Sequence, residues 1–163
     1  MVLTVEELNS KRHRRADFSC GVDALDYYLK ALATQHRTKG VATSFVLIDS
    51  AEPARILGYY SLSAASLRFS QLSEADRKGL PAYPVPAARI GRLAVSTAAR
   101  SRGLGELLLQ NAIKRVLTAR STLGVLAVVV EAKDDIATAF YRKYGFRSCD
   151  LESRQMYLPL GTE

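Results

Sequence analysis

Arg100, Gly103 and Gly105, spaced as Arg-x-x-Gly-x-Gly, are the strongest chemical signal in the chain. They follow the apolar stretch 89–95 and open an amphipathic stretch that runs to about residue 120. This order predicts a strand, a short loop and a helix whose first amides have no partner within the helix. Those amides and the positive end of the helix dipole attract anions, and glycines let a ligand approach the backbone. The loop therefore predicts a diphosphate site, with a ligand-free tight turn as the alternative.

Residues that the sequence lacks exclude several classes of ligand. No Gly-Lys-Ser/Thr follows the glycines, which argues against a nucleoside-triphosphate loop, and Leu108 stands where a dinucleotide fingerprint needs its third glycine. Cys20 and Cys149 lie too far apart for a disulfide framework or a Cys-x-x-Cys metal site. We interpret His13 and His36 as surface or helix residues rather than bases or metal ligands. A diphosphate held by backbone amides without a metal ion remains.

Hydrophobic periodicity predicts the elements that position this loop. We expect a helix over residues 22–36, capped by Asp17 or Ser19, and a hairpin of strands 43–48 and 55–67 joined by the turn 49–53. A loop with a helical turn at 73–78 fills residues 68–86, before a strand at 88–95. The helix 103–120 should face inward with Leu109, Ile113, Val116 and Leu117. A strand covered on both faces (124–130), a helix from 134 or 135 to 144 ended by Gly145, and strands 146–149 and 154–158 complete the chain.

Two motifs resemble the GNAT N-acetyltransferase superfamily. The Arg100-x-x-Gly103-x-Gly105 loop after an apolar strand resembles the family's acetyl-coenzyme A pyrophosphate motif. Residues 131–146 resemble its closing motif, an alanine-containing helix that ends in Phe-Tyr-x-x-x-Gly-Phe. The resemblance implies an α+β fold in one domain over residues 1–163. Its mixed, mostly antiparallel sheet would be flanked by helices, with strands splayed at the acetyl-CoA cleft.

The resemblance also implies roles for particular residues and acetyl-CoA as the cofactor. Tyr141 falls where the family has the acid that protonates the departing coenzyme thiolate, whereas Phe140 and Tyr144 fit the buried stripe of a helix. The cofactor-binding residues would be Leu93, Ala94, Val95, Arg100, Ser101, Arg102, Gly103, Leu104, Gly105 and Glu106.

Positive charge is concentrated in two places. The 163-residue chain has a net charge of +7, and residues 89–121 hold seven bases against one acid, Glu106. A second cluster spans residues 11–15. Basic clusters attract phosphates through a salt-sensitive Coulomb term, although a solvated surface is the plainer interpretation of the N-terminal cluster. The candidate RNA contacts are Arg92, Arg89, Lys11, Arg12, Arg14 and Arg15.

The acceptor amine can be narrowed from proton chemistry. A lysine amine, with a pKa of ~10.4, is neutral in about one molecule in two thousand at pH 7, whereas an α-amine with a pKa of ~7.7–8.0 is neutral in roughly a tenth. Residues 89–95 include no Asp, Glu or His to act as a base. A positively charged site without a side chain to accept a proton favours an α-amine carried on a polyanion. Aminoacyl-tRNA is such an acceptor.

A narrower resemblance agrees with this acceptor. Residues 18–29, 58–63 and 83–86, leading into 91–95, resemble the GNAT toxins of bacterial type II toxin–antitoxin systems. The resemblance implies acetylation of the α-amino group of aminoacyl-tRNA, arrest of translation and a homodimer. It also implies neutralisation by a ribbon-helix-helix antitoxin, through which alone the chain would meet operator DNA.

Two other classes of function stay open at this point. The first is a protein or small-molecule amine N-acetyltransferase with no toxin role, and the second is a non-enzymatic nucleic-acid-binding module. The N-terminus lacks the basic start and apolar run of a signal peptide, and the apolar run 125–130 is too short to span a bilayer. We therefore expect a cytoplasmic protein that does not associate with membranes.

Overall fold

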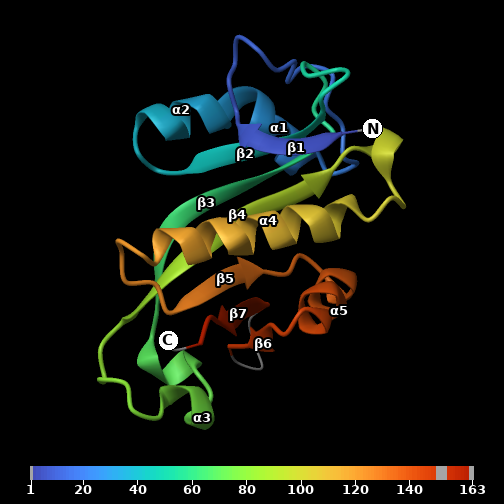
Figure 1. Cartoon of the computed structure of the whole chain (residues 1–163). Helices are drawn as coiled ribbons and strands as arrows, with labels where there is room; N and C mark the ends of the chain where they lie inside the picture. The colour runs from blue at the N-terminus through green and yellow to red at the C-terminus, as the bar shows by residue number, and fades with distance from the viewer. Residues whose placement is uncertain (1, 150–153, 162–163) are drawn as a thin grey trace. The chain divides into compact units, whose positions relative to one another are not determined.

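A computed structural model describes residues 2–149 and 154–161. In chain order (Figure 1) the elements are β1 (Leu3–Glu7), α1 (Asp23–Tyr27), the π-helical η1 (Tyr28–Leu32), α2 (Ala33–Thr38), β2 (Thr43–Asp49), β3 (Gly58–Leu67), the 3-10 turn η2 (Phe69–Gln71), α3 (Glu74–Arg77), β4 (Val85–Val95), the 3-10 turn η3 (Thr97–Ala99), α4 (Leu104–Ala119), β5 (Ala127–Glu131), α5 (Asp135–Lys143), β6 (Arg147–Ser148) and β7 (Gln155–Pro159).

The chain forms two compact units, and three elements run from one into the other. Unit 1 comprises Met1–Ser63 and Gly91–Lys114, and unit 2 comprises Ala64–Ile90 and Arg115–Glu163. The boundaries fall within β3, β4 and α4.

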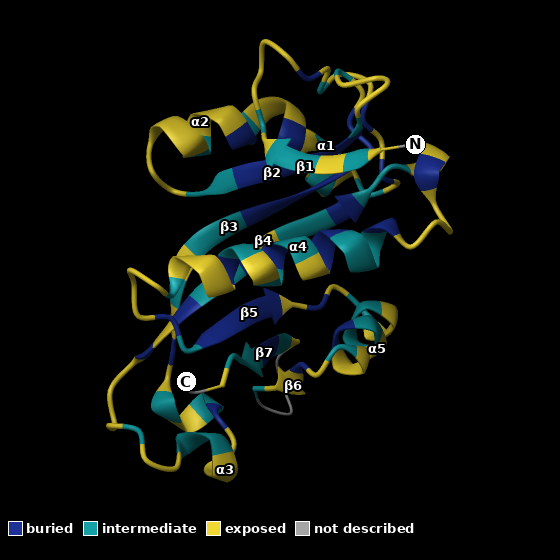
Figure 2. Ribbon diagram, viewed as in Figure 1, coloured by how far each residue is buried: buried dark blue, intermediate teal, exposed yellow. Residues whose placement is uncertain are grey.

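In unit 1 the strand order is β1-β2-β3-β4, and helical residues pack on both faces of this sheet. Strand β2 is antiparallel to β1 and to β3, with Leu3 opposite Asp49 and Thr43 opposite Leu62. Successive side chains of a strand point to opposite faces. Val46 and Ile48 accordingly join the cluster that holds the helical stretch 23–38, while Leu47 lies between them in sequence and joins Leu104 and Leu108 of α4. Figure 2 shows the resulting run of buried residues along β2.

Gly58 at the start of β3 permits the close approach of β4 and α4. A Cβ atom there would lie 2.8 Å from the Ala94 carbonyl oxygen and 2.8 Å from Leu108 Cδ1. Real Cβ atoms essentially never come this near other heavy atoms, so a side chain at residue 58 would push the strand or the helix away. The missing side chain thus sets how tightly β3, β4 and α4 pack within unit 1.

In unit 2 the strand order is β4-β5-β7-β6. Strands β4 and β5 are parallel, with Ala87–Arg89 opposite Ala127–Val129, whereas β5 and β7 are antiparallel. All four residues 127–130 are buried, which confirms the predicted strand covered on both faces, although β5 begins at Ala127 rather than at residue 124. Parallel and antiparallel pairs together confirm the expected mixed sheet; the splay of the strands beyond residue 89 stays a prediction.

A polar network in unit 2 anchors the α3 segment to the sheet. The Tyr157 hydroxyl donates to Asp76 Oδ2 over 2.6 Å and accepts from the Ser73 amide over 2.9 Å. Arg147 pairs with the same carboxylate oxygen. These bonds lower the pKa of Asp76, although its partial burial opposes the shift. The 68–86 segment is therefore tied to β6 and β7 by bonds that its own sequence does not reveal.

Most predicted elements are confirmed, with boundary changes of a few residues. The helix expected over 22–36 spans 23–38 with a π-helical turn, and the strand expected at 88–95 begins at Val85. Ser73 caps α3 and Asp134 caps α5 through their side chains. Strand β1 was not predicted, because its five residues include three polar ones.

Two predictions about side chains were wrong. Neither Asp17 nor Ser19 caps the first helix: Val22 occupies that place without a side-chain bond, and Asp26 Oδ1 instead accepts from the Cys20 amide at 2.9 Å. Leu117 is 45% exposed rather than inward-facing. The buried positions of α4 are Leu104, Leu108, Leu109, Ala112 and Val116, and Leu117 is rotated about 100° beyond the last of them.

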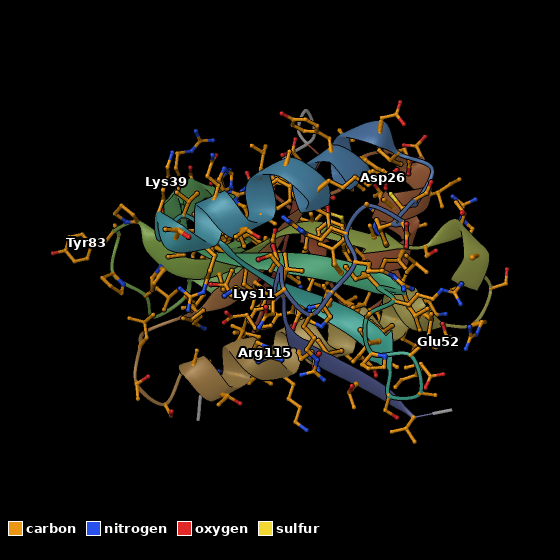
Figure 3. The ribbon with its side chains drawn as sticks, turned by 90° about the horizontal axis from the view of Figure 1, so that it is seen from above. Lys11, Asp26, Lys39, Glu52, Tyr83 and Arg115 are labelled. Carbon is orange, nitrogen blue, oxygen red and sulfur yellow. The ribbon has the colours of Figure 1, made fainter. Side chains whose placement is uncertain are left out.

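Charged side chains mark the outside of the units. Lys39 at the end of α2 and Glu52 in the β2–β3 turn extend away from the ribbon in Figure 3 and are exposed. Within residues 2–149 and 154–161, no helix is long and apolar enough to cross a bilayer.

We predict that Leu108→Ala lowers the free energy of unfolding by about 2–5 kcal/mol, because it removes a fully buried side chain and leaves a cavity. Leu117→Ala, on the exposed side of the same helix, should change it by less than about 0.5 kcal/mol. Urea denaturation of both variants measures the difference. Equal effects would show that the faces of α4 are assigned incorrectly.

Candidate active site

The loop before α4 carries two residues in the left-handed region, as an anion-binding backbone requires. Ser101 has φ 65° and Gly103 has φ 71°, and α4 begins at Leu104. A left-handed conformation is uncommon for serine and occurs in strained functional loops. Successive amides around such residues form concave nests for anions. A Cβ at Gly103 would meet no atom within 4 Å, so space next to this backbone is open to a ligand.

Arg100 is bound to the N-terminal segment. Its Nη2 donates to the Cys20 carbonyl oxygen at 2.8 Å, and the Thr97 amide donates to the Ser19 carbonyl oxygen at 2.8 Å. These two bonds fix residues 19–20 against the turn that precedes α4. The sequence did not show this contact, because its partners lie about eighty positions apart in the chain.

The side chains of the strand before the loop point alternately into two hydrophobic clusters of unit 1. Leu93 and Val95 pack beside Leu104 and Leu108, whereas Ala94 is buried in the cluster around the first helix. The Ser96 amide donates to the Leu57 carbonyl oxygen at 2.8 Å. On α4, Glu106 accepts from Gln110. The side chains of 93–95 are therefore committed to packing, and any coenzyme contact from them must come from the main chain.

Arg92 is held against an aromatic ring in unit 1. Its guanidinium carbon lies 3.5 Å from the centre of the buried Tyr28 ring, and the Tyr28 hydroxyl is 3.0 Å from His36 Nδ1. A guanidinium stacked on an aromatic face is stabilised by the ring quadrupole. Burial raises the pKa of Tyr59, and the positive charge of Arg92 opposes this rise. Tyr28 thus positions Arg92, a role the helical periodicity of the sequence did not indicate.

Tyr141 lies in unit 2, on a helix whose two ends are fixed. Asp134 Oδ1 accepts from the Ala137 amide at 2.8 Å, and the Tyr144 and Phe146 amides donate to the Tyr141 carbonyl oxygen. The Tyr141 ring packs against Phe146, with ring centres 5.3 Å apart, and is 8% exposed. Within the described part of the chain its hydroxyl makes no hydrogen bond. Burial raises the pKa of Tyr141 to about 12, so the phenol keeps its proton at neutral pH.

The N-terminal basic cluster is partly neutralised by neighbours in unit 1. Arg12 pairs with Glu6, Arg14 with Asp17, and Arg15 donates to the Lys30 carbonyl oxygen. His13, expected on the surface or on a helix, is 4% exposed and lies in the loop after β1. The Asn9 amide donates to its Nδ1, so Nε2 carries the proton and donates to Glu6 at 2.7 Å. The surface interpretation of His13 was wrong because two local partners satisfy its ring.

The remaining candidates divide between the units. Lys11 is exposed in unit 1, and Arg89 is half-buried on β4 in unit 2. Arg102 lies exposed in the loop of unit 1. No group of three or more His, Cys, Asp or Glu in residues 2–149 and 154–161 has a geometry fit for a metal ion.

We predict that Tyr141 remains protonated to unusually high pH in the folded protein. Its pKa of about 12 exceeds the unfolded value of ~10, so folding stability is fully present below pH ~10 and falls as the pH rises toward 12. Between pH 9 and 12, the free energy of unfolding of Tyr141→Phe should therefore fall by about 2–3 kcal/mol less than that of the wild type. Urea denaturation between pH 9 and 12 measures it. An unchanged alkaline profile in the variant would contradict the burial of the phenol.

The family comparison agrees with the glycine loop. Residues 29–160 match the model of the acetyltransferase (GNAT) domain, a range that includes parts of both units. The resemblance seen in the Arg-x-x-Gly-x-Gly and closing motifs is thereby confirmed.

Similar proteins extend the comparison. The chain is 35% identical to the "tRNA-acetylating toxin" of Mycobacterium tuberculosis over 129 residues, which cover 79% of this chain and 75% of the relative. A solved structure of AtaT complexed with acetyl-methionyl-tRNAfMet is 27% identical, covers 97% of this chain and 95% of that one, and has a TM-score of 0.88. A structure of a Tyr-to-Phe mutant of AtaT bound to the C-terminus of the antitoxin AtaR and acetyl-CoA is 27% identical, covers 96% and 92%, and has a TM-score of 0.80.

Left-handed residues before α4, the mixed sheet and the matched family model lead to one conclusion: the chain belongs to the GNAT acetyltransferase family.

Proposed function

We propose that the protein transfers the acetyl group of acetyl-CoA to the α-amino group of aminoacyl-tRNA and thereby blocks translation as a toxin. The observation that carries the proposal is the left-handed backbone at Ser101 and Gly103, with open space beside Gly103, in a chain similar to a tRNA-acetylating toxin. Residues 89–95 include no side chain that could accept a proton from the amine, and the net charge is +7. Both features support an α-amine carried on RNA.

The coenzyme site is assigned to the loop and to the strand that precedes it. The amides of Ser101, Arg102, Gly103, Leu104, Gly105 and Glu106 bind the diphosphate, and the main chain of Leu93, Ala94 and Val95 binds the pantetheine arm. Arg100 holds the loop through Cys20 and adds positive charge beside it. When bound, acetyl-CoA supplies an acetyl group activated as a thioester.

Tyr141 acts as the acid of the reaction. Transfer forms a bond between the amine nitrogen and the acetyl carbon and breaks the carbon–sulfur bond. The phenol gives its proton to the departing thiolate, and the amine nitrogen gives up its own proton to water. A raised pKa supports this role because it keeps the phenol protonated until the thiolate forms.

RNA contacts are assigned to Arg92 and the N-terminal bases Lys11, Arg12, Arg14 and Arg15 in unit 1, and to Arg89 in unit 2. Their contacts are with phosphates, which position an RNA without reading its sequence. Arg12 and Arg14 have carboxylate partners that RNA would displace, whereas Arg92 is stacked on Tyr28 and ready to bind.

The same proposal covers regulation and assembly. A ribbon-helix-helix antitoxin neutralises the protein, and operator DNA is bound only through the antitoxin complex. We place the protein in the cytoplasm as a homodimer whose chain forms one domain over residues 1–163. A relative captured with the C-terminus of its antitoxin supports the antitoxin partner.

We predict that the protein, incubated with labelled acetyl-CoA, transfers label to total charged tRNA and not to a protein extract. Tyr141→Phe should lower turnover about 10²–10⁴-fold, as expected for loss of a positioned acid, with little change in acetyl-CoA affinity. Tyr144→Phe is the matched control and should retain activity, because we assign that ring to packing against Phe140.

Other outcomes identify the alternatives. Label in protein but never in aminoacyl-tRNA would show a protein acetyltransferase. Absence of any thermal shift with saturating acetyl-CoA would favour a nucleic-acid-binding module, since a ligand that binds the folded state raises its melting temperature.

We predict that Gly103→Asp abolishes acetyl-CoA binding, whereas Gly103→Asn weakens it much less. Asp and Asn both tolerate a left-handed backbone, and an added Cβ at residue 103 would meet no protein atom. The two variants therefore differ in charge alone. A carboxylate beside a diphosphate should reduce affinity at least about tenfold relative to the amide. Titration calorimetry of both variants measures the ratio. Equal affinities would place the diphosphate elsewhere.

A further inference from the structure

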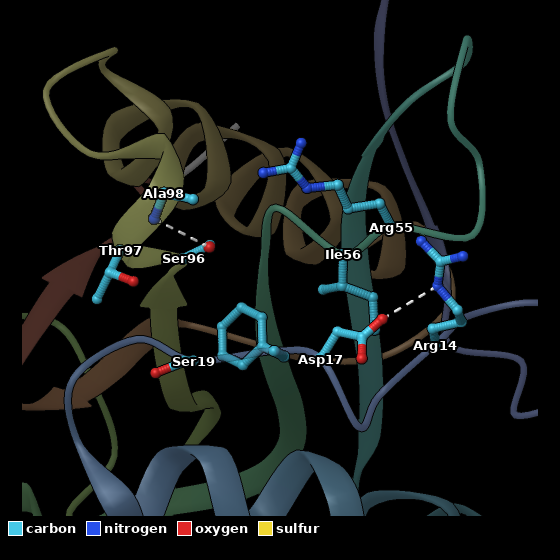
Figure 4. Close-up of a pocket in the computed structure, with 9 residues that line it drawn as sticks. Arg14, Asp17, Ser19, Arg55, Ile56, Ser96, Thr97 and Ala98 are labelled. Carbon is cyan, nitrogen blue, oxygen red and sulfur yellow. Dashed lines mark hydrogen bonds and ion pairs between the residues drawn. The ribbon is translucent and has the colours of Figure 1, made fainter.

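A pocket in unit 1, outside the loop assigned to the diphosphate, is lined by two arginines. It has a volume of about 180 Å³ and lies among three segments: residues 14–19, 55–56 and 96–98. Phe18 and Ile56 line it and are buried, and Figure 4 shows Ile56 among the polar side chains of the lining. This volume is far more than the ~10–15 Å³ that a single water molecule requires. The pocket therefore has room for a larger polar group.

The charge of the pocket favours an anion. Arg14 Nε lies 3.2 Å from Asp17 Oδ2, so the one carboxylate of the lining is already paired. The guanidinium of Arg55 makes no hydrogen bond or ion pair within residues 2–149 and 154–161. Arg55 is exposed to solvent, so its positive charge is available to an anion at the pocket.

Unused hydrogen-bond donors add to this charge. Ser19 and Thr97 line the pocket and are exposed, and their hydroxyls bond to no described residue, whereas the Ser96 hydroxyl accepts from the Ala98 amide. A planar guanidinium with neighbouring hydroxyl donors matches the tetrahedral oxygens of a phosphate better than the single charge of a lysine would.

The backbone holds the two arginines in a fixed relation. The Arg14 amide donates to the Ala54 carbonyl oxygen at 2.8 Å, and residues 14 and 55 form an isolated parallel bridge. The Thr97 amide donates to the Ser19 carbonyl oxygen, and this bond links the segment 96–98 to the segment 14–19. The lining segments are thus cross-linked by main-chain bonds, so the pocket is part of the fold of unit 1.

We propose that this pocket binds a phosphate ester group through Arg55, with the Ser19 and Thr97 hydroxyls as further donors. The proposal rests on the proposed function for its two sources: the 3′-phosphate of coenzyme A or a backbone phosphate of the RNA substrate. The coenzyme fits because the lining residue Ala98 stands two places before Arg100 in the loop assigned to the coenzyme, and RNA fits because the lining residue Arg14 is among the bases assigned to RNA.

The test compares Arg55→Gln with Lys39→Gln, which removes the same charge from an exposed position at the end of α2 (Figure 3). Titration calorimetry measures binding of acetyl-CoA and of 3′-dephospho-acetyl-CoA, and fluorescence anisotropy measures binding of deacylated tRNA over a series of salt concentrations. Arg55→Lys, which retains the charge without the fork, should give an intermediate affinity.

If the coenzyme is the source, Arg55→Gln weakens acetyl-CoA binding about tenfold and leaves the dephospho form unchanged. If RNA is the source, tRNA binding weakens about tenfold and the slope of log affinity against log salt falls by about one. Arg55→Gln matching Lys39→Gln in both arms, while the wild type binds both probes, would overturn the pocket and leave the proposed function standing. A wild type that binds neither probe would overturn both.

Discussion

The backbone between β4 and α4 must pass through left-handed conformations at Ser101 and Gly103 before the helix begins. This constraint turns the chain from a strand packed on both sides into a helix whose first amides have no partner within the helix, beside open space at Gly103. The helix itself is fixed by Leu104 and Leu108, which pack against Leu47 of the sheet. A loop made only of glycines would be too mobile to hold an anion in one place, so its rigidity has to come from the packed elements on either side.

The N-terminal segment supplies part of that rigidity. The Cys20 carbonyl oxygen accepts from Arg100, while the Cys20 amide donates to Asp26 at the start of the first helical stretch. One residue thus links the helical stretch 23–38 to the loop before α4. The basic run at 11–15 is tied to the same unit through Glu6, Asp17 and Lys30. Much of the charge that the sequence places near the N-terminus is therefore matched locally, and Arg92 and Arg55 become more informative than the run itself.

Local periodicity predicted most of the fold, because strands such as 127–131 and helices such as 135–143 have patterns that depend on neighbours in sequence. The failures came from side-chain contacts four to seven residues apart, which helix and strand periodicity does not encode. Val22 occupies the N-cap of the first helix and has no polar side chain to cap it, and the nearby carboxylate of Asp26 accepts from the Cys20 amide instead. His13 looked like part of a solvated basic run and is buried by Asn9 and Glu6. The glycine loop was visible in the sequence, whereas the left-handed serine beside it, the ring beneath Arg92 and the pocket at Arg55 need three-dimensional proximity.

The stack of Arg92 on Tyr28 has a consequence for the thermodynamics of recognition. A free arginine side chain samples many rotamers and loses up to about 2 kcal/mol of conformational entropy when a partner immobilises it. Here the ring restricts those rotamers during folding, before any polyanion arrives, so association has less disorder to remove. In the RNA contact proposed for it, Arg92 is preorganised, and this advantage should persist at salt concentrations that screen the mobile bases of the surface.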